Sequence, residues 1–486
     1  MKRLFLALFA IVALLGAIII VRAATLMSRQ VSAPPAPPMV LDHDAMSVRL
    51  ADALKLQTIS FQSARESSAA EFPRFHNLLT KSFPRVHAQL TREIVNEYSL
   101  LYTWNGKSER LKPVLLMAHL DVVPVDPDSE RSWTHPPFSG QLADGFIWGR
   151  GAMDDKSSVM AILEAVEYLL KAGFAPKRTL YLAFGHDEEI GGKHGAAQIA
   201  ELLASRGVQL EFVLDEGMNI LNGVINGMTS PVALIGIAEK GYLSLQLTVN
   251  SSGGHSSIPP ADTAIGTLSR ALQRLESAPF PARLRGPTRQ MFEFLGAEMA
   301  WSKKIMLANL WLFEPWVIKQ LTRMPLSNAS LRTTLAPTLF NAGVKENVLP
   351  EHASAVVNLR VMPGETTTGA LDYVRSIVDD PRIQLTALPI RMEPSAVSDV
   401  ESPSFKLLQR TIREIAPAAI AAPALLVAAT DSRHYAGLTR NIFRFLPITL
   451  NVGDTKRYHG IDERISLQDY ARCVNFYARL IHNSNE

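Results

Sequence analysis

Short apolar runs alternate with amphipathic segments along the first half of the chain. The apolar runs at 113–117, 178–184 and 211–214 each have the length of one buried strand, whereas 156–170 and 192–205 repeat apolar residues at helical spacing. Strands separated by helices of this length pair in parallel through crossover helices. The pattern therefore predicts an α/β fold with a doubly wound, mostly parallel sheet that helices cover on both faces.

The N-terminus has a different pattern. After Lys2 and Arg3, 18 uncharged residues fill 4–21 and end at Arg22. This length is at the lower end of the ~17–25 residues that span a bilayer, and exceeds the ~7–15 apolar residues of a signal peptide. We predict an uncleaved anchor over 1–24, with a cleaved signal or a buried core helix as alternatives. The leading cations place the rest of the chain outside the cytoplasm, in a periplasmic or other extracytoplasmic space, and cleavage would make it a secreted protein.

Composition narrows the classes of function. The 486 residues are 47% hydrophobic and 20% charged, which is typical of a globular protein, and the net charge of +3 gives no broad basic surface for nucleic acid. Cys473 is the only cysteine, so any metal must be held by His, Asp and Glu. The Pro-rich stretch 32–39 predicts a semi-rigid linker within 25–44.

Polar residues follow each predicted strand, at the sheet edge where α/β proteins bind ligands. They are His119 and Asp121, then the 186–189 sequence HDEE, then Asp215 with Glu216; Asp154 and Asp155 stand at the start of the helix 156–170. Singly, such residues are usually helix caps, solvated turns or core histidines. Together, the carboxylates would repel each other and need a cation. Imidazole and carboxylate without sulfur favour Zn²⁺, with Mn²⁺ or Co²⁺ as alternatives.

Two metal ions would need a shared carboxylate and a further histidine. His459, in the polar loop 457–466 before the last predicted helix (467–481), is the best candidate from context, although spacing alone does not single it out.

Six motifs in order resemble the zinc-dependent aminoacylase/carboxypeptidase family. They are LLMAHLDVVPV (115–125), GRGAMDDK (149–156), HDEEIGG (186–192), FVLDEG (212–217), GGHSSIPP (253–260) and RYHGIDERIS (457–466). The resemblance extends from about residue 45 to the C-terminus. TDSRHY at 430–435 and an enlarged middle segment resemble the carboxypeptidase S and N-fatty-acyl-amino-acid synthase/hydrolase branch.

The resemblance implies a site with two zinc ions per subunit. One ion would be held by His119 and Asp215, the other by Glu189 and His459, with Asp154 bridging both. Glu188 would be the general base that takes a proton from the attacking water and passes it to the leaving amine, and Asp121 would orient His119. The family's usual Met-Lys-Gly after the bridge is Asp155-Lys156-Ser157 here, which leaves Asp155 as an alternative bridge.

The family also inserts an α+β lid or dimerisation domain into the catalytic domain. Residues 242–249 and 355–361 alternate as half-buried strands do, which places the lid at 241–395 between catalytic parts 45–240 and 396–486. The resemblance implies that His255 reaches a neighbouring active site across a homodimer, with a solvated loop histidine as the alternative. It also implies that Asn347 and Arg360 hold a substrate carboxylate, with Arg433 as a weaker candidate.

One lid segment, 291–321, is rich in apolar and aromatic residues, and Pro315 is expected to interrupt its helical pattern. It predicts either a buried helical hairpin or an apolar wall that receives an acyl chain or contacts a membrane surface.

The leading functional prediction is hydrolysis of an amide bond next to a free carboxylate, in a small peptide or an N-acyl amino acid. A reversible N-fatty-acyl-amino-acid synthase/hydrolase is one alternative, and a catalytically silent, membrane-tethered binding protein is an alternative of another class. All five implied ligands and Glu188 are present, which favours an enzyme. The chain lacks the G-x-S-x-G, H-E-x-x-H and G-x-x-x-x-G-K motifs, which argues against serine hydrolases, single-zinc proteases of that type and P-loop enzymes.

Overall fold

The three predicted strands lie side by side in a ten-stranded sheet. In this computed structural model, which describes residues 1–37, 39–61 and 68–486, β3 (Val114–His119) pairs in parallel with β6 (Leu180–Gly185) and β7 (Phe212–Asp215). The strand order is β1-β2-β6-β3-β7-β17-β9-β8-β18, and β16 also pairs with β9. The other strands are β1 (Thr91–Val95), β2 (Ser99–Trp104), β8 (Ile220–Leu221), β9 (Val232–Glu239), β16 (Ile420–Leu426), β17 (Ile442–Arg444) and β18 (Thr449–Leu450).

Helices cover both faces of this sheet, as predicted. Successive residues of β3 point to opposite faces, so Leu116 packs in a core with α6 whereas Leu115 and Met117 pack in a second core with α7. The larger core is lined by α2 (His43–Leu54), α3 (Glu71–Ser82), α4 (Pro84–Gln89), α6 (Lys156–Lys171), α14 (Pro403–Ile415) and α15 (Leu467–Asn483). The smaller core is closed by α7 (Ala196–Ser205) and η2 (Asp431–Tyr435). Near the α2 side, β4 (Gln141–Ala143), β5 (Phe146–Trp148) and β19 (Arg464–Ser466) form a small sheet, preceded in the chain by α5 (Pro127–Glu130).

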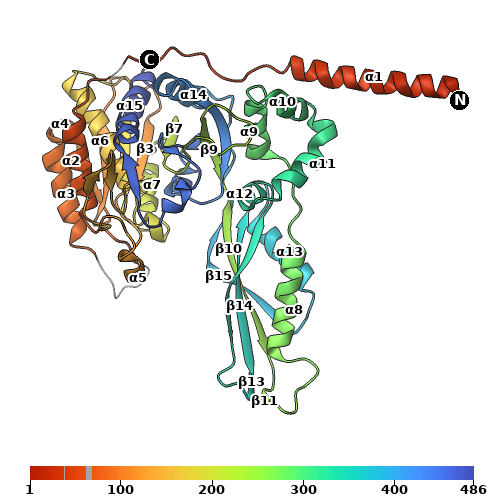
Figure 1. The fold of residues 1–486 in the computed structure, drawn as a ribbon. Helices are drawn as coiled ribbons and strands as arrows, with labels where there is room; N and C mark the ends of the chain where they lie inside the picture. The colour runs from red at the N-terminus through yellow and green to blue at the C-terminus, as the bar shows by residue number, and fades with distance from the viewer. Residues whose placement is uncertain (38, 62–67) are drawn as a thin grey trace.

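A second, antiparallel sheet projects from the body (Figure 1). Its order is β12-β14-β10-β15, and β10 (Gly241–Asn250) pairs with β14 (His352–Val361) along their whole length. The alternating pattern of both strands buries one face against α8 (Ala264–Ser277) and α13 (Thr367–Val378). The outer strands are β12 (Thr334–Ala342) and β15 (Ile383–Met392), and β11 (Gly254–His255) with β13 (Val348–Leu349) forms the far tip.

A group of four short helices joins α8 to β12. They are α9 (Gly286–Leu295), α10 (Trp301–Ala308), α11 (Leu310–Leu321) and α12 (Pro325–Ala329). The prediction of a buried hairpin is wrong for α10 and α11, because only Ala308, Leu310 and Val317 are buried in them. Pro315 lies inside α11 and does not interrupt it; the break falls at Asn309, whose backbone leaves the helical region.

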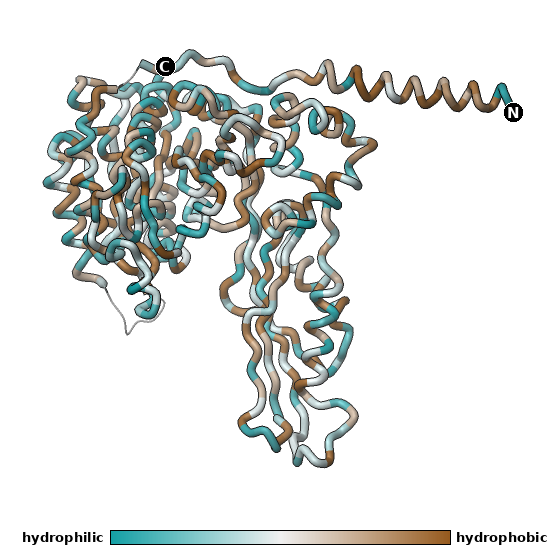
Figure 2. The backbone as a smooth tube through the Cα atoms, viewed as in Figure 1, coloured by the Kyte–Doolittle hydropathy of each residue, from teal (hydrophilic) through white to brown (hydrophobic). Residues whose placement is uncertain are grey.

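The apolar N-terminal segment forms one helix, α1 (Lys2–Ala24), that projects away from the body (Figure 1). Its best 18-residue window has a mean hydropathy of 3.2 and none of it is buried, so it is not a core helix. Figure 2 shows hydrophobic colour over most of its length, with hydrophilic colour at its N-terminal end. Its length and composition suit either a membrane anchor or a signal sequence. Pro38 of the predicted linker lies outside the described residues.

Candidate metal centre and active site

The predicted polar residues meet at the carboxyl edge of the central sheet. His119 is the last residue of β3, Glu188 and Glu189 form the short helix η1 (Glu188–Ile190) after β6, and Asp215 ends β7. Asp154 precedes α6. Segments far apart in the sequence therefore converge because parallel strands end at the same edge.

Asp154 occupies the centre of this group. Its Oδ1 lies 2.9 Å from His119 Nε2, and its Oδ2 lies 3.1 Å from His459 Nε2. His459 Nε2 is also 3.2 Å from Glu189 Oε2. One carboxylate thus faces a different imidazole with each oxygen, which is the arrangement of a bridging ligand.

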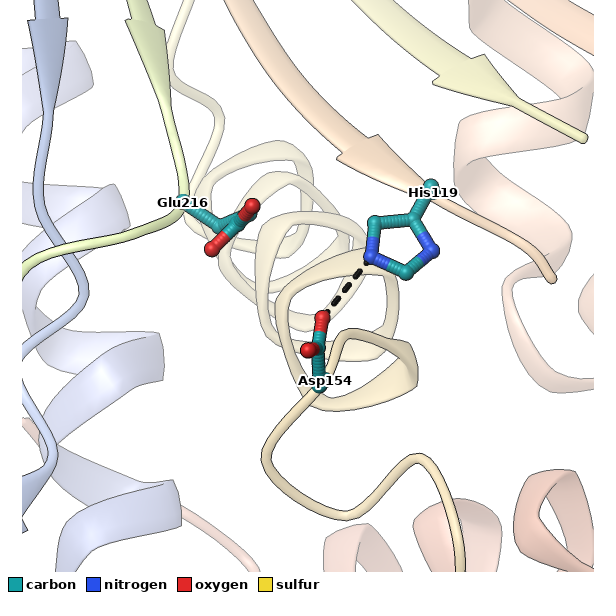
Figure 3. A group of neighbouring side chains, drawn as sticks. All are labelled: His119, Asp154 and Glu216. Carbon is teal, nitrogen blue, oxygen red and sulfur yellow. Dashed lines mark hydrogen bonds and ion pairs between the residues drawn. The ribbon is translucent and has the colours of Figure 1, made fainter. Parts of the chain in front are cut away.

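His119 is held in one orientation. Its Nδ1 donates a hydrogen bond to the backbone carbonyl of Asp121 at 3.0 Å, and the Asp121 carboxylate lies 3.3 Å from the same nitrogen. This leaves Nε2 directed at Asp154, as Figure 3 shows. Orientation through the far ring nitrogen is the usual arrangement for a ligand histidine. Here the backbone carbonyl, and not only the predicted carboxylate of Asp121, provides it.

Asp121 also fixes the turn that carries the two glutamates. Its carboxylate accepts hydrogen bonds from the backbone N–H groups of Glu188 and Glu189, both at 3.2 Å, and from Ser60 Oγ at 2.6 Å. The turn continues through Gly192, which has φ +65° and lies against the Asp431 carboxylate, so a Cβ there would collide with it. The HDEEIGG sequence is thus constrained at both ends.

Two groups of side chains could each hold a metal ion. The first is His119, Asp154 and Glu216 (Figure 3), and the second is Asp154, Glu189 and His459. Within each group, one ligand atom per residue lies within 4.8 Å of the others. Together the two groups contain five residues, of which Asp154 is shared, and the family resemblance also implied five ligands.

The first group contains Glu216, whereas the family resemblance implied Asp215 as the ligand. The Asp215 carboxylate accepts hydrogen bonds from the backbone N–H groups of Glu216 at 3.0 Å and Ser432 at 2.9 Å. As the last residue of β7 it is buried inside the sheet edge, and the next residue reaches the site. Asp215 and Glu216 are adjacent in the FVLDEG motif, so the sequence already offered Glu216 as a second possible ligand at this position. Asp155, the alternative bridge, is fully buried with Oδ1 bonded to Ser158, and belongs to neither group.

The electrostatics of the site indicate a need for positive charge. Burial and neighbouring carboxylates raise the pKa values of Glu188 and Glu216 well above their usual range. Hydrogen bonds that His459 donates to the carboxylates of Asp154 and Glu189 raise its pKa to about 10. Burial opposes the charged form of His119, but its hydrogen bonds to Asp121 and Asp154 outweigh burial and raise its pKa. Protons on the imidazoles thus neutralise the carboxylates where a cation would otherwise do so.

The donor set fits divalent metal ions of the zinc type. It contains two imidazoles and three carboxylates without sulfur. Among the described residues, the buried Glu189 Oε1 has no hydrogen-bond partner, and a ligand position would satisfy it. The site therefore has both the charge and the ligand atoms that such ions require.

Sequence reasoning missed the buried support behind Asp154 and His459. Glu463 Oε2 forms an ion pair with Arg150 at 2.6 Å. Its Oε1 accepts hydrogen bonds from the backbone N–H groups of Met153 at 2.8 Å and Asp154 at 3.2 Å. Arg150 also donates to the carbonyl of His459 at 3.2 Å. Both lie within recognised motifs, but nothing in their spacing indicates a pair 313 positions apart in the chain.

The two arginines predicted for substrate binding lie near each other. Arg433 donates to the carbonyl of Gly191, just after η1, at 2.9 Å. Arg360, on β14, stacks over Tyr242 at 4.8 Å, and burial together with the charge of Arg433 lowers its pKa. Within the described chain, neither guanidinium has a carboxylate within ion-pair distance. Arg360 of the second sheet and Arg433 of the α/β body therefore form a positively charged region without an acidic partner among the described residues.

His255 and Asn347 lie elsewhere, at the tip of the second sheet. His255 pairs with Val348 in the β11–β13 ribbon, its Nδ1 contacts Ser257, and Ser256 N–H donates to the Asn347 carbonyl at 3.2 Å. Arg360 is at the opposite end of β14, about 25 Å away at ~3.3 Å per strand residue. The structure thus separates Asn347 from Arg360 within one chain, because the strand between them is fully extended.

Comparison with known proteins gives consistent matches. A sequence model of peptidase family M20/M25/M40 matches residues 115–483. Probable carboxypeptidase S-like 2 of Dictyostelium discoideum is 46% identical over 448 residues, covering 91% of this chain and 85% of the relative. N-fatty-acyl-amino acid synthase/hydrolase PM20D1 of Mus musculus is 44% identical over 449 residues, covering 91% and 88%. The M20 family metallo-carboxypeptidase Sso-CP2 of Sulfolobus solfataricus has the same fold, with a TM-score of 0.67 at 17% identity, covering 92% and 100%.

Proposed function

The chain belongs to peptidase family M20/M25/M40, and from this premise we propose that it hydrolyses N-acyl amino acids and small peptides whose scissile amide adjoins a free carboxylate. It is an enzyme of the metallopeptidase class that acts on peptide or amide bonds. The observation that carries the proposal is the position of Asp154 between His119 and His459, beside Glu188.

We propose two Zn²⁺ ions per subunit, with Mn²⁺ or Co²⁺ as substitutes. His119, Asp154 and Glu216 would hold one ion, and Asp154, Glu189 and His459 the other. Ions bound there would supply Lewis acidity, which polarises the scissile carbonyl and makes a water molecule acidic near neutral pH.

Glu188 is the proposed general base. Its backbone is fixed by Asp121, while its carboxylate accepts no hydrogen bond from the described part of the chain. Burial raises its pKa well above the ordinary value, so the carboxylate has a high affinity for a proton. It can therefore accept the proton of the attacking water at a carboxylate oxygen and deliver it to the departing nitrogen.

Arg360 and Arg433 are the proposed partners of the substrate carboxylate. A planar guanidinium binds a carboxylate through two parallel hydrogen bonds, and a half-buried, unpaired one offers more binding energy than an exposed one. Arg433 contacts the loop that follows Glu188 and Glu189, and Arg360 lies close enough to Arg433 for the two charges to interact.

The remaining expectations concern assembly and location. We propose that His255 and Asn347 act on the site of a second subunit in a homodimer formed through the lid, since both lie at its exposed tip. The division into catalytic parts 45–240 and 396–486 and lid 241–395 remains the proposed one.

We also propose that α1 anchors the protein with its body outside the cytoplasm, and that a cleaved α1 would give a secreted form.

The proposal is tested with the zinc-loaded, full-length enzyme and a panel of dipeptides and N-acyl amino acids of increasing acyl length. Each substrate is paired with its C-terminal amide. We expect hydrolysis of the acids and poor turnover of the amides, and the ranking by acyl length separates peptides from fatty-acyl substrates. Equal turnover of acids and amides would contradict carboxylate recognition, and no turnover of any member would favour a binding protein.

A further inference from the structure

The segment 301–326, which contains α10 to α12, carries six large apolar side chains that are exposed, and we call this segment the tryptophan face. Three of the six tryptophans in the chain lie in it, and they are 52%, 56% and 46% exposed at Trp301, Trp311 and Trp316. The other three, Trp104, Trp133 and Trp148, are buried in the α/β body. Leu312, Met324 and Leu326 are also exposed in the same segment. Exposed clusters of this kind mark a contact with a partner or a membrane.

The tryptophan face is joined to the base of α1. Asn309, fully buried between α10 and α11, donates from Nδ2 to the backbone carbonyl of Ile19 at 3.0 Å. Arg22 Nε donates to the carbonyl of Ala308 at 3.2 Å, and Trp311 Nε1 donates to Asn309 Oδ1 at 3.3 Å. In Figure 1, α10 and α11 lie on the side of the body from which α1 projects.

These contacts set the depth of the face relative to any membrane that α1 crosses. Ile19 is three residues before Arg22, or about 4.5 Å along a helix of ~1.5 Å rise per residue. The uncharged stretch ends between them, so the α10–α11 junction lies at the level where acyl chains meet headgroups. Tryptophan is enriched at this level because its ring is apolar and its N–H is polar.

The charges on these helices match a lipid surface. Residues 301–326 contain Lys303, Lys304, Lys319 and Arg323 against the single acid Glu314, which lies 3.6 Å from Arg289. In the described chain, none of the four cations has an acidic partner within ion-pair distance. A helix pair with aromatic residues and unpaired cations suits binding at an anionic interface.

We propose that the tryptophan face docks on the outer surface of the bilayer that α1 enters, as a second membrane contact. Trp301, Trp311 and Trp316 insert at the headgroup boundary, and the lysines bind anionic headgroups. The body is then held against the surface and does not rotate freely on a single tether. This contact rests on the proposed anchoring by α1 and does not depend on the proposed catalytic chemistry.

The native tryptophans provide the test. Full-length protein is reconstituted into vesicles of phosphatidylcholine and phosphatidylglycerol, with bromine either absent or placed near the headgroup end of the acyl chains. We expect the brominated lipid to quench wild-type fluorescence and to leave the W301F/W311F/W316F variant unquenched, since its remaining tryptophans are buried in the body. Turnover of a short soluble substrate shows that the variant is folded.

A second variant tests the charges without changing the fluorophores. K304E/K319E should lose quenching in vesicles that contain phosphatidylglycerol, whereas K345E, a charge reversal at the exposed tip of the second sheet, should not. Equal fluorescence of wild type in brominated and plain vesicles would overturn the proposal. Cross-linking of two copies at position 311, with no quenching of tryptophan fluorescence by brominated lipid, would also overturn the proposal. It would assign the tryptophan face to a dimer interface.

Discussion

Replacing Arg360 by alanine should selectively impair the hydrolysis of substrates that carry a free carboxylate. Arg360 is half-buried, stacks on Tyr242, and has no acidic partner among the described residues. The contact is made in the ground state and persists in the transition state. Its loss should therefore raise KM more than it lowers kcat.

The structure bounds the size of this effect. A charge-assisted, bidentate pair in a partly desolvated site contributes roughly 2–4 kcal/mol, or about 30- to 900-fold in kcat/KM. Arg433 remains in Arg360→Ala and loses a repulsive neighbour, since its charge contributes to the lowered pKa of Arg360. We therefore expect a loss at the lower end, about 2 kcal/mol or ~30-fold.

The assay compares kcat/KM for an N-acyl amino acid and its amide in wild type, Arg360→Ala and Arg391→Ala. Arg391 is a matched control: its β15 position faces Leu243, next to the Tyr242 that pairs with Arg360, and it already contacts Glu393 at 3.4 Å. The amide lacks the charge, so its slow rate should change little in either variant. Equal losses for acid and amide in Arg360→Ala would contradict carboxylate binding by Arg360 and assign it a structural role.

Three further predictions follow from the site. Glu188→Gln should keep its metal content but lose at least ~10²-fold in kcat, measured beside Glu97→Gln on the surface; a near-wild-type rate would move the base elsewhere. Glu463→Gln leaves the buried Arg150 without its carboxylate, so denaturant unfolding should show a loss of about 3 kcal/mol, against less than ~1 kcal/mol for Glu93→Gln in the exposed pair with Arg206. His459 has its pKa raised to about 10 in the metal-free protein, so the stabilisation from its protonated form is complete below about 6.5 and is lost as pH rises through 10. The thermal midpoint of metal-free protein should fall over that window, and the fall should be smaller in His459→Asn; an unchanged fall would contradict the assignment.

The central sheet could be predicted because each of its inner strands is a continuous apolar run. β3, β6 and β7 are buried on both faces, so hydrophobicity alone locates them, and the helix between β3 and β6 has a clear apolar stripe. Strands β8, β17 and β18 have two or three residues each, which is too short for a periodic pattern. β17 pairs in parallel with β7 but antiparallel with β9, and this change of strand direction has no local sequence pattern.

The sequence locates candidate site residues where a polar residue directly follows a strand, but it does not distinguish between adjacent residues. Asp215 and Glu216 are neighbours at the end of β7, and only the tertiary structure shows that the Asp215 carboxylate accepts a hydrogen bond from the Ser432 backbone N–H. Asn347 and Arg360 are 13 residues apart in sequence, yet an extended strand separates them. The Arg150–Glu463 pair joins distant segments that no local pattern connects.

The metal content of Asp154→Ala tests the bridged two-metal site most directly. Wild-type protein should contain close to two zinc ions per chain by elemental analysis. Because both groups share Asp154, its removal should empty both positions, while Glu97→Ala on the surface should retain two ions. A full complement of zinc in Asp154→Ala, or a single ion in the wild-type protein, would contradict the bridged two-metal site.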